Sequence, residues 1–275
     1  MNYRSPLLNV MAGAAHKAAR RLIRDFGELE NLQVSRKGPA DFVSKADRRA
    51  EEVVRTALQK ARPAYGLLME EGGAVVGTDT SNRWIVDPLD GTMNFLHGIP
   101  HFAISIALER DGDLFAGVVY SPVPDEMYVA EKGSGAFLNG RRLRVSGRRN
   151  MAESIFATGV PFMGIPDHEL FLEQARAVMA VSAGVRRFGS AALDLAYVAA
   201  GRYDGYWENG LNPWDVAAGI VLVREAGGFV TDLAGGRNML SGGGILAANT
   251  ELHAPLARLL AGAAKKSKTG AASTD

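Results

Sequence analysis

The sequence predicts an α/β protein with an α+β N-terminal lobe over residues 1–148 and an α/β C-terminal lobe over residues 149–263. Three observations support this prediction. Two segments with helical spacing of apolar residues come first, strand-like alternation fills the middle third, and strand-like and helix-like segments alternate after about residue 150. Residues 264–275 are small and polar, so we expect them to form a disordered tail.

The N-terminal third contains two predicted helices. Ser5-Pro6 is typical of an N-cap followed by the first helical residue, and Gly27 is typical of a helix stop. The second helix is predicted to begin near Ser44, because the preceding segment 35–43 (SRKGPADFV) is rich in turn-forming residues.

The middle third is predicted to be antiparallel sheet. In residues 102–109 (FAISIALE), large apolar residues alternate with small ones. Asp111-Gly112 is a hairpin signal, after which 114–122 (LFAGVVYSP) would return as the next strand. Asn139-Gly140 predicts another tight turn further along.

The last third alternates between the two kinds of element, as expected for an α/β lobe. The predicted strands are residues 154–160, 202–208, 229–232 and 243–249. The predicted helices are residues 167–182, 190–201, 213–228 and 250–262.

The composition excludes several classes of function. The 275 residues include no cysteine, which rules out disulfides, thiolate metal sites and cysteine nucleophiles. The formal net charge of +1 argues against a nucleic-acid or membrane partner, and no apolar run is long enough to span a bilayer. We therefore expect a cytoplasmic protein in which any metal is held by oxygen ligands, as Mg²⁺ is.

One stretch, WIVDPLDGTMNFLHGIP at residues 84–100, places two aspartates where a strand is predicted to give way to a short helix. Pro88 keeps Asp87 out of helical geometry, so both Asp87 and Asp90 are expected on a tight loop. Gly91 permits close backbone approach, and the amides of a helix N-terminus attract phosphate. The loop could thus offer carboxylates to a cation and amides to a phosphate, although Asp is also a common turn and cap residue.

Other acidic residues have the same two interpretations. Glu70 and Glu71 follow an apolar segment and could be a solvated turn. Asp215 follows Pro213 at a predicted helix start and could serve only as a helix cap. Asp47, with Asp41 on the other side of the predicted helix start, could simply favour the helix dipole.

Taken together, these segments resemble the inositol monophosphatase family of lithium-sensitive, Mg²⁺-dependent phosphatases. The first family motif, W-[IV]-[IV]-D-P-[IL]-D-G-T-x-N-F, is met by residues 84–95. The second, W-D-x-A-[AG]-G followed by E-A-G-G, is met by residues 214–219 and 225–228. The acidic pair Glu70-Glu71 and the D-x-V-[ST]-x-x-D element at 41–47 also match, and the resemblance covers about residues 5–262.

The resemblance implies a layered αβαβα sandwich and a phosphomonoesterase. Its expected substrate is inositol 1-phosphate or a similar small polyol or sugar phosphate, hydrolysed by metal-activated water. The implied cofactors are two to three Mg²⁺ ions, with Li⁺ as an inhibitor, and the implied assembly is a homodimer. Histidinol-phosphate, bisphosphonucleotide and fructose-1,6-bisphosphate phosphatases of the same superfamily stay open as alternatives.

The resemblance also implies roles for individual residues. The expected metal ligands are Glu70, Asp87, the Leu89 carbonyl, Asp90 and Asp215. The attacking water would be positioned by Glu70 and by the Thr92 hydroxyl with Asp47 behind it, and Asp41 would lie near the weakest-held metal. Phosphate and polyol contacts are expected from Asp90, Gly91, Thr92, Gly189, Ser190, Ala191 and Glu208.

Three positions depart from common family forms, namely Met69, Gly72 and Met93. None of the expected metal ligands is lost, so the departures affect the expected substrate and leave the reaction class unchanged. Met93 directly follows the phosphate loop and could alter substrate fit.

Two further features have alternative interpretations. His97 and His101 could be metal ligands, but their spacing fits no common site and surface histidines are the simpler interpretation. The arginines at 141, 142, 144, 148 and 149 could bind RNA or another anion, or could form a solvated hairpin face. This cluster motivates a second hypothesis, a regulatory scaffold that binds RNA or protein.

Overall fold

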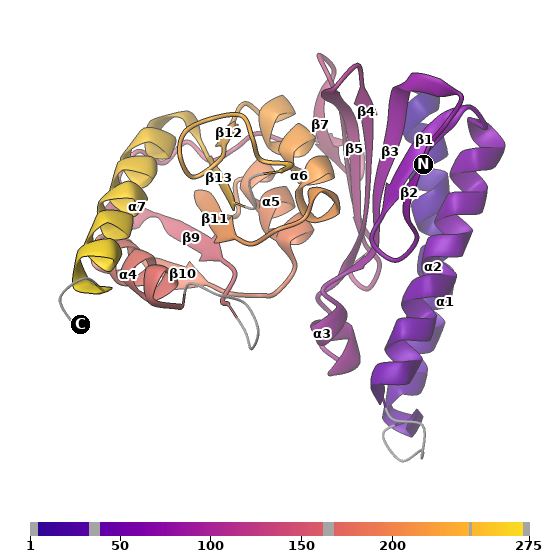
Figure 1. Cartoon of the computed structure of the whole chain (residues 1–275), viewed down its shortest axis with the longest axis horizontal. Helices are drawn as coiled ribbons and strands as arrows, with labels where there is room; N and C mark the ends of the chain where they lie inside the picture. Colours follow the sequence, from indigo (N-terminus) through magenta and orange to yellow (C-terminus); the bar gives the residue numbers. More distant parts are fainter. Residues whose placement is uncertain (1–4, 33–38, 162–167, 242–243, 272–275) are drawn as a thin grey trace.

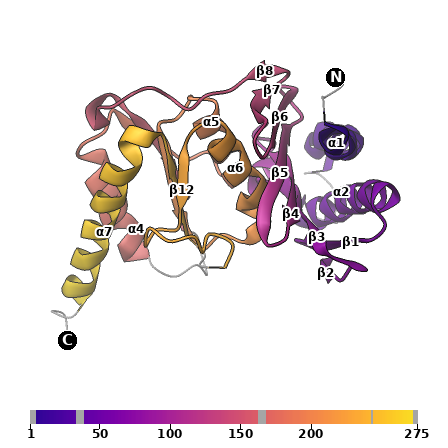
Figure 2. The same ribbon diagram turned by 90° about the horizontal axis from the view of Figure 1, so that it is seen from above.

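Five alternating layers make up the molecule. The structure, a computed structural model, describes residues 5–32, 39–161, 168–241 and 244–271. Helices α1 and α2 cover an eight-stranded sheet, α5 and α6 fill the space between that sheet and a five-stranded one, and α4 and α7 cover the far side (Figures 1 and 2). The layered αβαβα sandwich expected from the sequence is confirmed.

The first sheet has the strand order β2-β1-β3-β4-β5-β6-β7-β8. Its strands pair antiparallel except β1 and β3, which run parallel. Their bounds are β1 Tyr65–Met69, β2 Gly73–Val75, β3 Asp79–Asp90, β4 Ala103–Arg110, β5 Asp113–Ser121, β6 Glu126–Glu131, β7 Gly135–Leu138 and β8 Arg141–Arg142.

Both turn dipeptides of this sheet adopt the predicted hairpin geometry. Asp111 and Gly112 have φ values of 51° and 78°, and Asn139 and Gly140 have 47° and 82°. Positive φ at both central positions is what the tight hairpin turn requires, so these dipeptides fix the register of the strands that they join.

The second sheet has the order β10-β9-β11-β13-β12. Strands β10, β9 and β11 are parallel, whereas β11, β13 and β12 pair antiparallel. Their bounds are β9 Ile155–Thr158, β10 Gly184–Arg186, β11 Gly205–Asn209, β12 Phe229–Thr231 and β13 Gly244–Ala248. Residues 143–154, with a short 3₁₀ turn at Met151–Glu153, link the sheets and include the lobe boundary predicted after residue 148.

The helices are amphipathic where they cover a sheet and apolar where they lie between sheets. Their bounds are α1 Pro6–Leu32, α2 Pro39–Ala61, α3 Thr92–Leu96, α4 His168–Met179, α5 Ala191–Ala199, α6 Pro213–Glu225 and α7 Thr250–Ala271. In α6, residues 216–223 are all buried, because this helix is packed on both sides. One apolar cluster therefore surrounds α5 and α6 between the two sheets, a second lies between the first sheet and α1 and α2, and a third lies between the second sheet and α4 and α7.

The inner layer depends on two glycines. A Cβ added at Gly117 on β5 would lie 2.5 Å from the Ala218 carbonyl oxygen of α6. One added at Gly219 on α6 would lie 2.5 Å from the Leu195 side chain of α5. Both distances are too short for real contacts, so α6 approaches its neighbours closely only because these positions lack side chains.

Several predicted boundaries were wrong. Helix α2 begins at Pro39 and not near Ser44, since Pro is well suited to the first turn of a helix, and Asp41 therefore lies inside the helix. Helix α1 continues past Gly27 to Leu32, because one exposed glycine does not stop a helix whose next residues are good helix formers. Likewise, α7 continues to Ala271 through alanines and lysines that we expected in a disordered tail, and residues 272–275 lie outside the described residues.

The two aspartates of the first motif lie within a strand and not on a loop after it. Strand β3 extends to Asp90, and its pairing with β4 shifts register between Asp87 and Asp90. An irregular strand end accommodates Pro88, which has no N–H to give to the ladder. Both carboxylates consequently come from a sheet with fixed register.

No helix within the described ranges is both long enough and apolar enough to cross a membrane.

Candidate active site

The end of β3 meets the start of α5, and Asp90 forms the contact. The Ser190 hydroxyl donates a short hydrogen bond to Oδ2 of Asp90, and the Ala192 backbone N–H donates to the same oxygen at 2.9 Å. Ser190 is also the N-cap of α5. Asp90 thus accepts hydrogen bonds from the N-terminus of α5, a helix in the other half of the chain. A negative charge is favoured at a helix N-terminus.

The segment after Asp87 folds back on itself through local hydrogen bonds. The Leu89 N–H donates to Oδ1 of Asp87 at 2.8 Å, and the Thr92 hydroxyl donates to the Leu89 carbonyl at 2.9 Å. Gly91 has φ 92°, and a Cβ there would lie 3.0 Å from the His101 carbonyl oxygen. The first turn of α3, whose amides have no partners within the helix, therefore begins beside the two aspartates.

Strand register places Glu70 beside Asp87. Strands β1 and β3 are parallel with Met69 opposite Val86. Glu70, which directly follows β1, therefore lies next to Asp87, which is still within β3. Burial and then the charge of Asp215 raise the pKa of Glu70, and the interaction with the Asp87 carboxyl group opposes this rise.

Asp215 enters from α6. It is the third residue of the helix, and one of its carboxylate oxygens accepts a 2.6 Å hydrogen bond from the Asn212 N–H in a capping box. The capping role considered in the sequence is therefore real. It coexists with proximity to the other acids, because the Asp215 charge also raises the pKa values of Glu70 and Asp90.

Asp47 lies on the inner face of α2 and is 3% exposed. Its charge interacts with Glu70, Glu71 and Glu51, and its Oδ1 has no hydrogen-bond partner among the described residues. The expected contact with the Thr92 hydroxyl is not formed, since that hydroxyl donates to the Leu89 carbonyl instead.

Glu208 is placed by the same kind of register as Glu70. Strands β9 and β11 are parallel with Thr158 opposite Trp207, so Gly159 lies against Glu208. A Cβ at Gly159 would be 1.9 Å from the Glu208 carboxyl carbon. The Tyr206 hydroxyl donates to Oε2 of Glu208 at 2.5 Å, which fixes the carboxylate on a second side.

Burial raises the pKa values of all these acids, and neighbouring acids add to the rise at each of them except Asp215. Burial is the largest cause, and it raises the pKa of Asp47 to about 8, of Glu70, Asp90 and Glu208 to about 7, and of Asp215 to about 6. The pKa of Asp87 is raised well above its usual range by burial and then by the charges of Asp90, Glu70 and Asp215. The positive charge of Arg48 opposes the rise in the pKa of Asp47, and that of Arg187 opposes the rise in the pKa of Glu208.

This donor set fits a divalent cation. Buried carboxylates without basic partners are costly unless a cation compensates them, and oxygen donors are what Mg²⁺ prefers. In the described part of the chain, however, no three acidic or histidine side chains already converge as a coordination sphere. Several of the carboxylates instead accept hydrogen bonds from neighbouring groups: Asp87 from the Leu89 N–H, Asp90 from Ser190 and Ala192, and Asp215 from the Asn212 N–H.

The remaining expected residues are also located. Gly189 (φ 81°), Ser190 and Ala191 lead into α5, next to Asp90. The side chain of Asp41 lies outside the described residues. His97 is exposed, while His101 packs 5.2 Å from the Phe188 ring and its pKa is lowered by burial. Neither histidine belongs to a metal cluster within the described ranges.

Three other residues contribute to the site, although none of them was among the expected site residues. Asn94 donates to the carbonyls of His101 and Phe188, each at 2.7 Å, and so ties α3 to the segment before α5. Asp194 on α5 is 1% exposed, and its charge interacts with Glu208 and Asp90. Gly159 has no sequence signal beyond being a glycine after a predicted strand.

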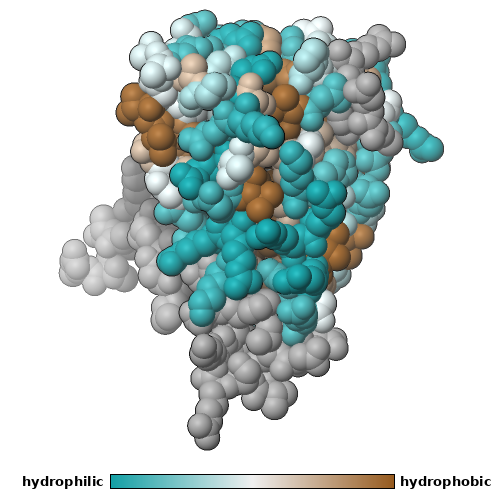
Figure 3. All heavy atoms as spheres, turned by 90° about the vertical axis from the view of Figure 1, so that its right-hand side faces the viewer, coloured by the Kyte–Doolittle hydropathy of each residue, from teal (hydrophilic) through white to brown (hydrophobic). Residues whose placement is uncertain are grey.

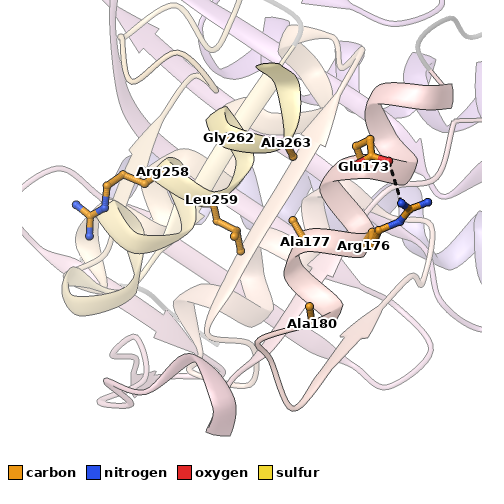
Figure 4. Close-up of a pocket in the computed structure, with 8 residues that line it drawn as sticks. All are labelled: Glu173, Arg176, Ala177, Ala180, Arg258, Leu259, Gly262 and Ala263. Atoms are coloured by element: carbon orange, nitrogen blue, oxygen red, sulfur yellow. Dashed lines mark ion pairs between the residues drawn. The ribbon is translucent and has the colours of Figure 1, made fainter. Parts of the chain in front are cut away.

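A separate hollow lies between α4 and α7 and includes none of these acids (Figure 4). Alanines and a glycine make up half of its lining, and the Arg176 guanidinium lies 3.3 Å from the Glu173 carboxylate. The candidate site is therefore the acidic cluster between the two sheets.

Comparison with known proteins gives the same picture over nearly the full chain. The chain is 60% identical over 253 residues to the inositol-1-monophosphatase of Mesorhizobium japonicum, covering 92% of this chain and 95% of that protein. It is also 45% identical over 244 residues to the Nus factor SuhB of Escherichia coli, covering 89% and 91%.

Solved structures of related proteins have the same fold as this chain. The crystal structure of the extragenic suppressor protein suhB from Bartonella henselae superposes with a TM-score of 0.87 at 57% identity, over 93% of this chain and 98% of that one. The inositol monophosphatase of Anabaena superposes at 0.83 with 37% identity, over 93% and 95%.

The family model that matches residues 4–266 is described as the inositol monophosphatase family. This is a family of phosphoric monoester hydrolases, which are generally metal-dependent. The match covers both sheets and every acid of the cluster, and the chain belongs to the inositol monophosphatase family.

Proposed function

We propose that this protein hydrolyses inositol 1-phosphate, or a similar small polyol or sugar phosphate, to the alcohol and inorganic phosphate with Mg²⁺ as cofactor. The observation that carries the proposal is the contact of Asp90 with the N-terminus of α5, which joins the acids of the first sheet to the Glu208 region of the second. The relatives named inositol-1-monophosphatase, at 55–60% identity, support the choice of substrate.

Two to three Mg²⁺ ions would be held by Glu70, Asp87, the Leu89 carbonyl, Asp90 and Asp215. When bound, they supply charge neutralisation at the phosphate and lower the pKa of a water molecule. The chain's own part is to position groups: Glu70 would accept the proton of the attacking water, and the Thr92 hydroxyl would orient that water. In that role the hydroxyl would turn to Asp47 from the Leu89 carbonyl, to which it donates in this structure. The cost of gathering these carboxylates is already visible in their raised pKa values.

Substrate recognition uses the other side of the cluster. The amides of Gly91 and Thr92, at the start of α3, would receive the phosphate oxygens. Asp90, Glu208 and the backbone at Gly189, Ser190 and Ala191 would accept and donate hydrogen bonds to the polyol hydroxyls. Glu208 suits this role because Gly159 and Tyr206 hold its carboxylate in one place.

A phosphate-release assay tests the proposal. With Mg²⁺ present, inositol 1-phosphate should be the best member of a panel that also contains histidinol phosphate, a bisphosphonucleotide and fructose 1,6-bisphosphate. Li⁺ should inhibit by taking the place of one Mg²⁺. Folded protein that releases phosphate from no member would contradict the proposed activity, and turnover unchanged across a Li⁺ titration would contradict the proposed metal arrangement.

We also propose a homodimer, which sedimentation of the full chain would test by giving twice the 29.3 kDa chain mass. The cytoplasmic location and the lobe boundary after residue 148 stay predictions.

A second candidate function is regulatory binding. It is favoured by the relatives named Nus factor SuhB, at 45–46% identity. The arginine-rich segment is one place to test it, since Arg141 and Arg142 are exposed on the edge strand β8. A partner that stays bound to an Asp87→Asn protein and is lost when Arg141 and Arg142 are neutralised would support this function. A partner that still binds the variant with Arg141 and Arg142 neutralised would exclude this surface as its binding site.

A further inference from the structure

Basic side chains gather on the outer face of α1 and α2. Figure 3 looks onto this side of the molecule, and much of its described surface is hydrophilic. The exposed side chains there include Lys17, Arg20, Arg21, Arg24, Arg48 and Arg49. The whole chain has a formal net charge of only +1, whereas these six side chains are all basic and outnumber Glu28 and Glu52, the exposed acids among the described side chains of the same helices. The near-zero net charge of the whole chain therefore does not describe the electrostatic potential at this surface.

A pocket of about 350 Å³ opens in this face between the two helices. It is lined by Arg21, Arg24 and Asp25 from α1 and by Arg49 from α2. Asp25 is only 2% exposed. Nε of Arg24 and Nη1 of Arg49 each lie 3.9 Å from one of its two carboxylate oxygens. A buried carboxylate thus holds guanidinium groups from two helices around one opening.

The contacts of Arg24 and Arg49 with Asp25 are ion pairs without hydrogen bonds. A separation of 3.9 Å is longer than a hydrogen bond, so Asp25 attracts Arg24 and Arg49 without consuming their N–H groups. Burial raises the pKa of Asp25, and the charges of Arg49, Arg24 and Arg21 oppose this rise. Glu28 at the rim, 3.8 Å from Arg24, is the other acidic group near the opening. The lining, with three guanidinium groups and one carboxylate, carries a net charge of +2.

We propose that this pocket, the α1–α2 pocket, binds the phosphate group of a phosphorylated ligand. Guanidinium groups match phosphate oxygens in charge and in the geometry of paired donors. The site is distinct from the acidic cluster, whose carboxylates call for a cation. Asp47 of that cluster is on the buried face of α2, whereas the Arg49 side chain is 49% exposed on the outer face.

Calorimetry with inorganic phosphate, in EDTA to remove divalent cations, tests the proposal. The double variant Arg21→Gln/Arg24→Gln should bind phosphate about tenfold or more weakly than wild type, because charge-assisted hydrogen bonds are lost. The matched control is Arg20→Gln, which removes an exposed charge from the same helix outside the pocket and should bind like wild type. Hydrolysis of inositol 1-phosphate should be unchanged in both variants, which separates this proposal from the proposed function. Equal affinity in all three proteins would overturn it.

A second arm identifies the source of the phosphate. A short single-stranded RNA oligonucleotide, followed by fluorescence anisotropy, is titrated into the same three proteins. Selective weakening in the double variant would assign the pocket to a polynucleotide phosphate, whereas selective weakening with inorganic phosphate alone would assign it to a small phosphate ester. Equal weakening in the double variant and in Arg20→Gln would mean diffuse attraction and would overturn the pocket, as would the absence of binding by wild type to either probe.

Discussion

Asp90 is the residue on which both halves of the candidate site depend. It accepts hydrogen bonds from Ser190 and Ala192, and its pKa is raised to about 7 by burial, with a further contribution from Asp215. An amide in its place keeps an oxygen for the same donors but removes the charge. The effect of the Asp90 charge on turnover can therefore be measured separately from the effect of the side chain's size and hydrogen-bonding shape.

Replacing Asp90 by Asn should lower kcat for inositol 1-phosphate about a hundredfold or more, because electrostatic stabilisation of the reacting groups is lost. The melting temperature at pH 8 should not fall, since a buried carboxyl with a raised pKa is removed. Asp111→Asn, at an exposed hairpin position, is the control and should behave like wild type. Near-normal turnover by Asp90→Asn would refute the role given to Asp90.

Gly159 limits where the Glu208 carboxylate can lie. In Gly159→Ala, the new Cβ would collide with a carboxyl carbon 1.9 Å away and displace it. If Glu208 contacts a polyol hydroxyl, KM should rise about tenfold or more while kcat changes little. Steady-state kinetics of this variant and of Glu208→Gln should agree in direction. An unchanged KM in Gly159→Ala would remove Glu208 from substrate binding.

At the scale of elements, α5 contains one acid in an otherwise apolar helix. Asp194 is 1% exposed, its Oδ1 has no partner among the described residues, and its pKa is raised well above the usual range by burial and by Glu208 and Asp90. A group with a raised folded pKa stabilises the fold only at low pH, and that contribution is lost as the pH rises above the unfolded pKa.

Asp194→Asn should therefore raise the melting temperature at pH 8, by about 2–4 °C for each kcal/mol gained, and the gain should vanish near pH 4. Differential scanning calorimetry across this range checks both the sign and the pH window. A lower melting temperature than wild type at pH 8 would mean that Asp194 holds a stabilising contact in its ionised form.

The packing of α5 against α6 is also testable. Gly219→Ala should destabilise by about 1–3 kcal/mol, since its Cβ would lie 2.5 Å from the Leu195 side chain. Gly262→Ala in α7 is the matched control, with no atom within 4 Å of the added Cβ, and should stabilise by about 0.4–1 kcal/mol. Urea denaturation of both variants measures the difference, and equal stability of the two would contradict the close approach.

At the scale of the whole molecule, we expect the acidic cluster to make stability depend on pH and on bound Mg²⁺. The pKa values of Asp47, Glu70, Asp90 and Asp215 are raised to between about 6 and about 8. Their unfolded values are near 4, so the metal-free protein should lose stability as the pH rises from about 4 to about 8.

Added Mg²⁺ should reverse this loss, and its effect on the melting temperature should be larger at pH 8 than at pH 5. Thermal unfolding with and without Mg²⁺ at the two pH values checks this without an activity assay. The variant Asp87→Asn should show a smaller Mg²⁺ effect at pH 8. A Mg²⁺ effect that is the same at both pH values would contradict the cluster as the metal site.

Local patterns in the sequence predicted much of the fold. Asp111-Gly112 and Asn139-Gly140 adopt the expected hairpin turns because their backbone requirement is local. The strand identity of Asp87 and Asp90 was missed, because a proline-containing strand end is stabilised by its pairing with β4, which no local pattern reports. Residues that act through partners distant in the sequence, such as Asn94 and Gly159, are recognisable only after the register of the sheets is known.

The contact between Asp90 and the first residues of α5 has a consequence for how the protein acquires activity. The Asp90 carboxylate meets Ser190 and Ala192 only when the two sheets have docked with α5 and α6 between them. Recovery of phosphate release during refolding should therefore lag behind recovery of secondary structure. The rate at which activity recovers should therefore report the docking of the two sheets, and circular dichroism should report the earlier formation of helices and strands.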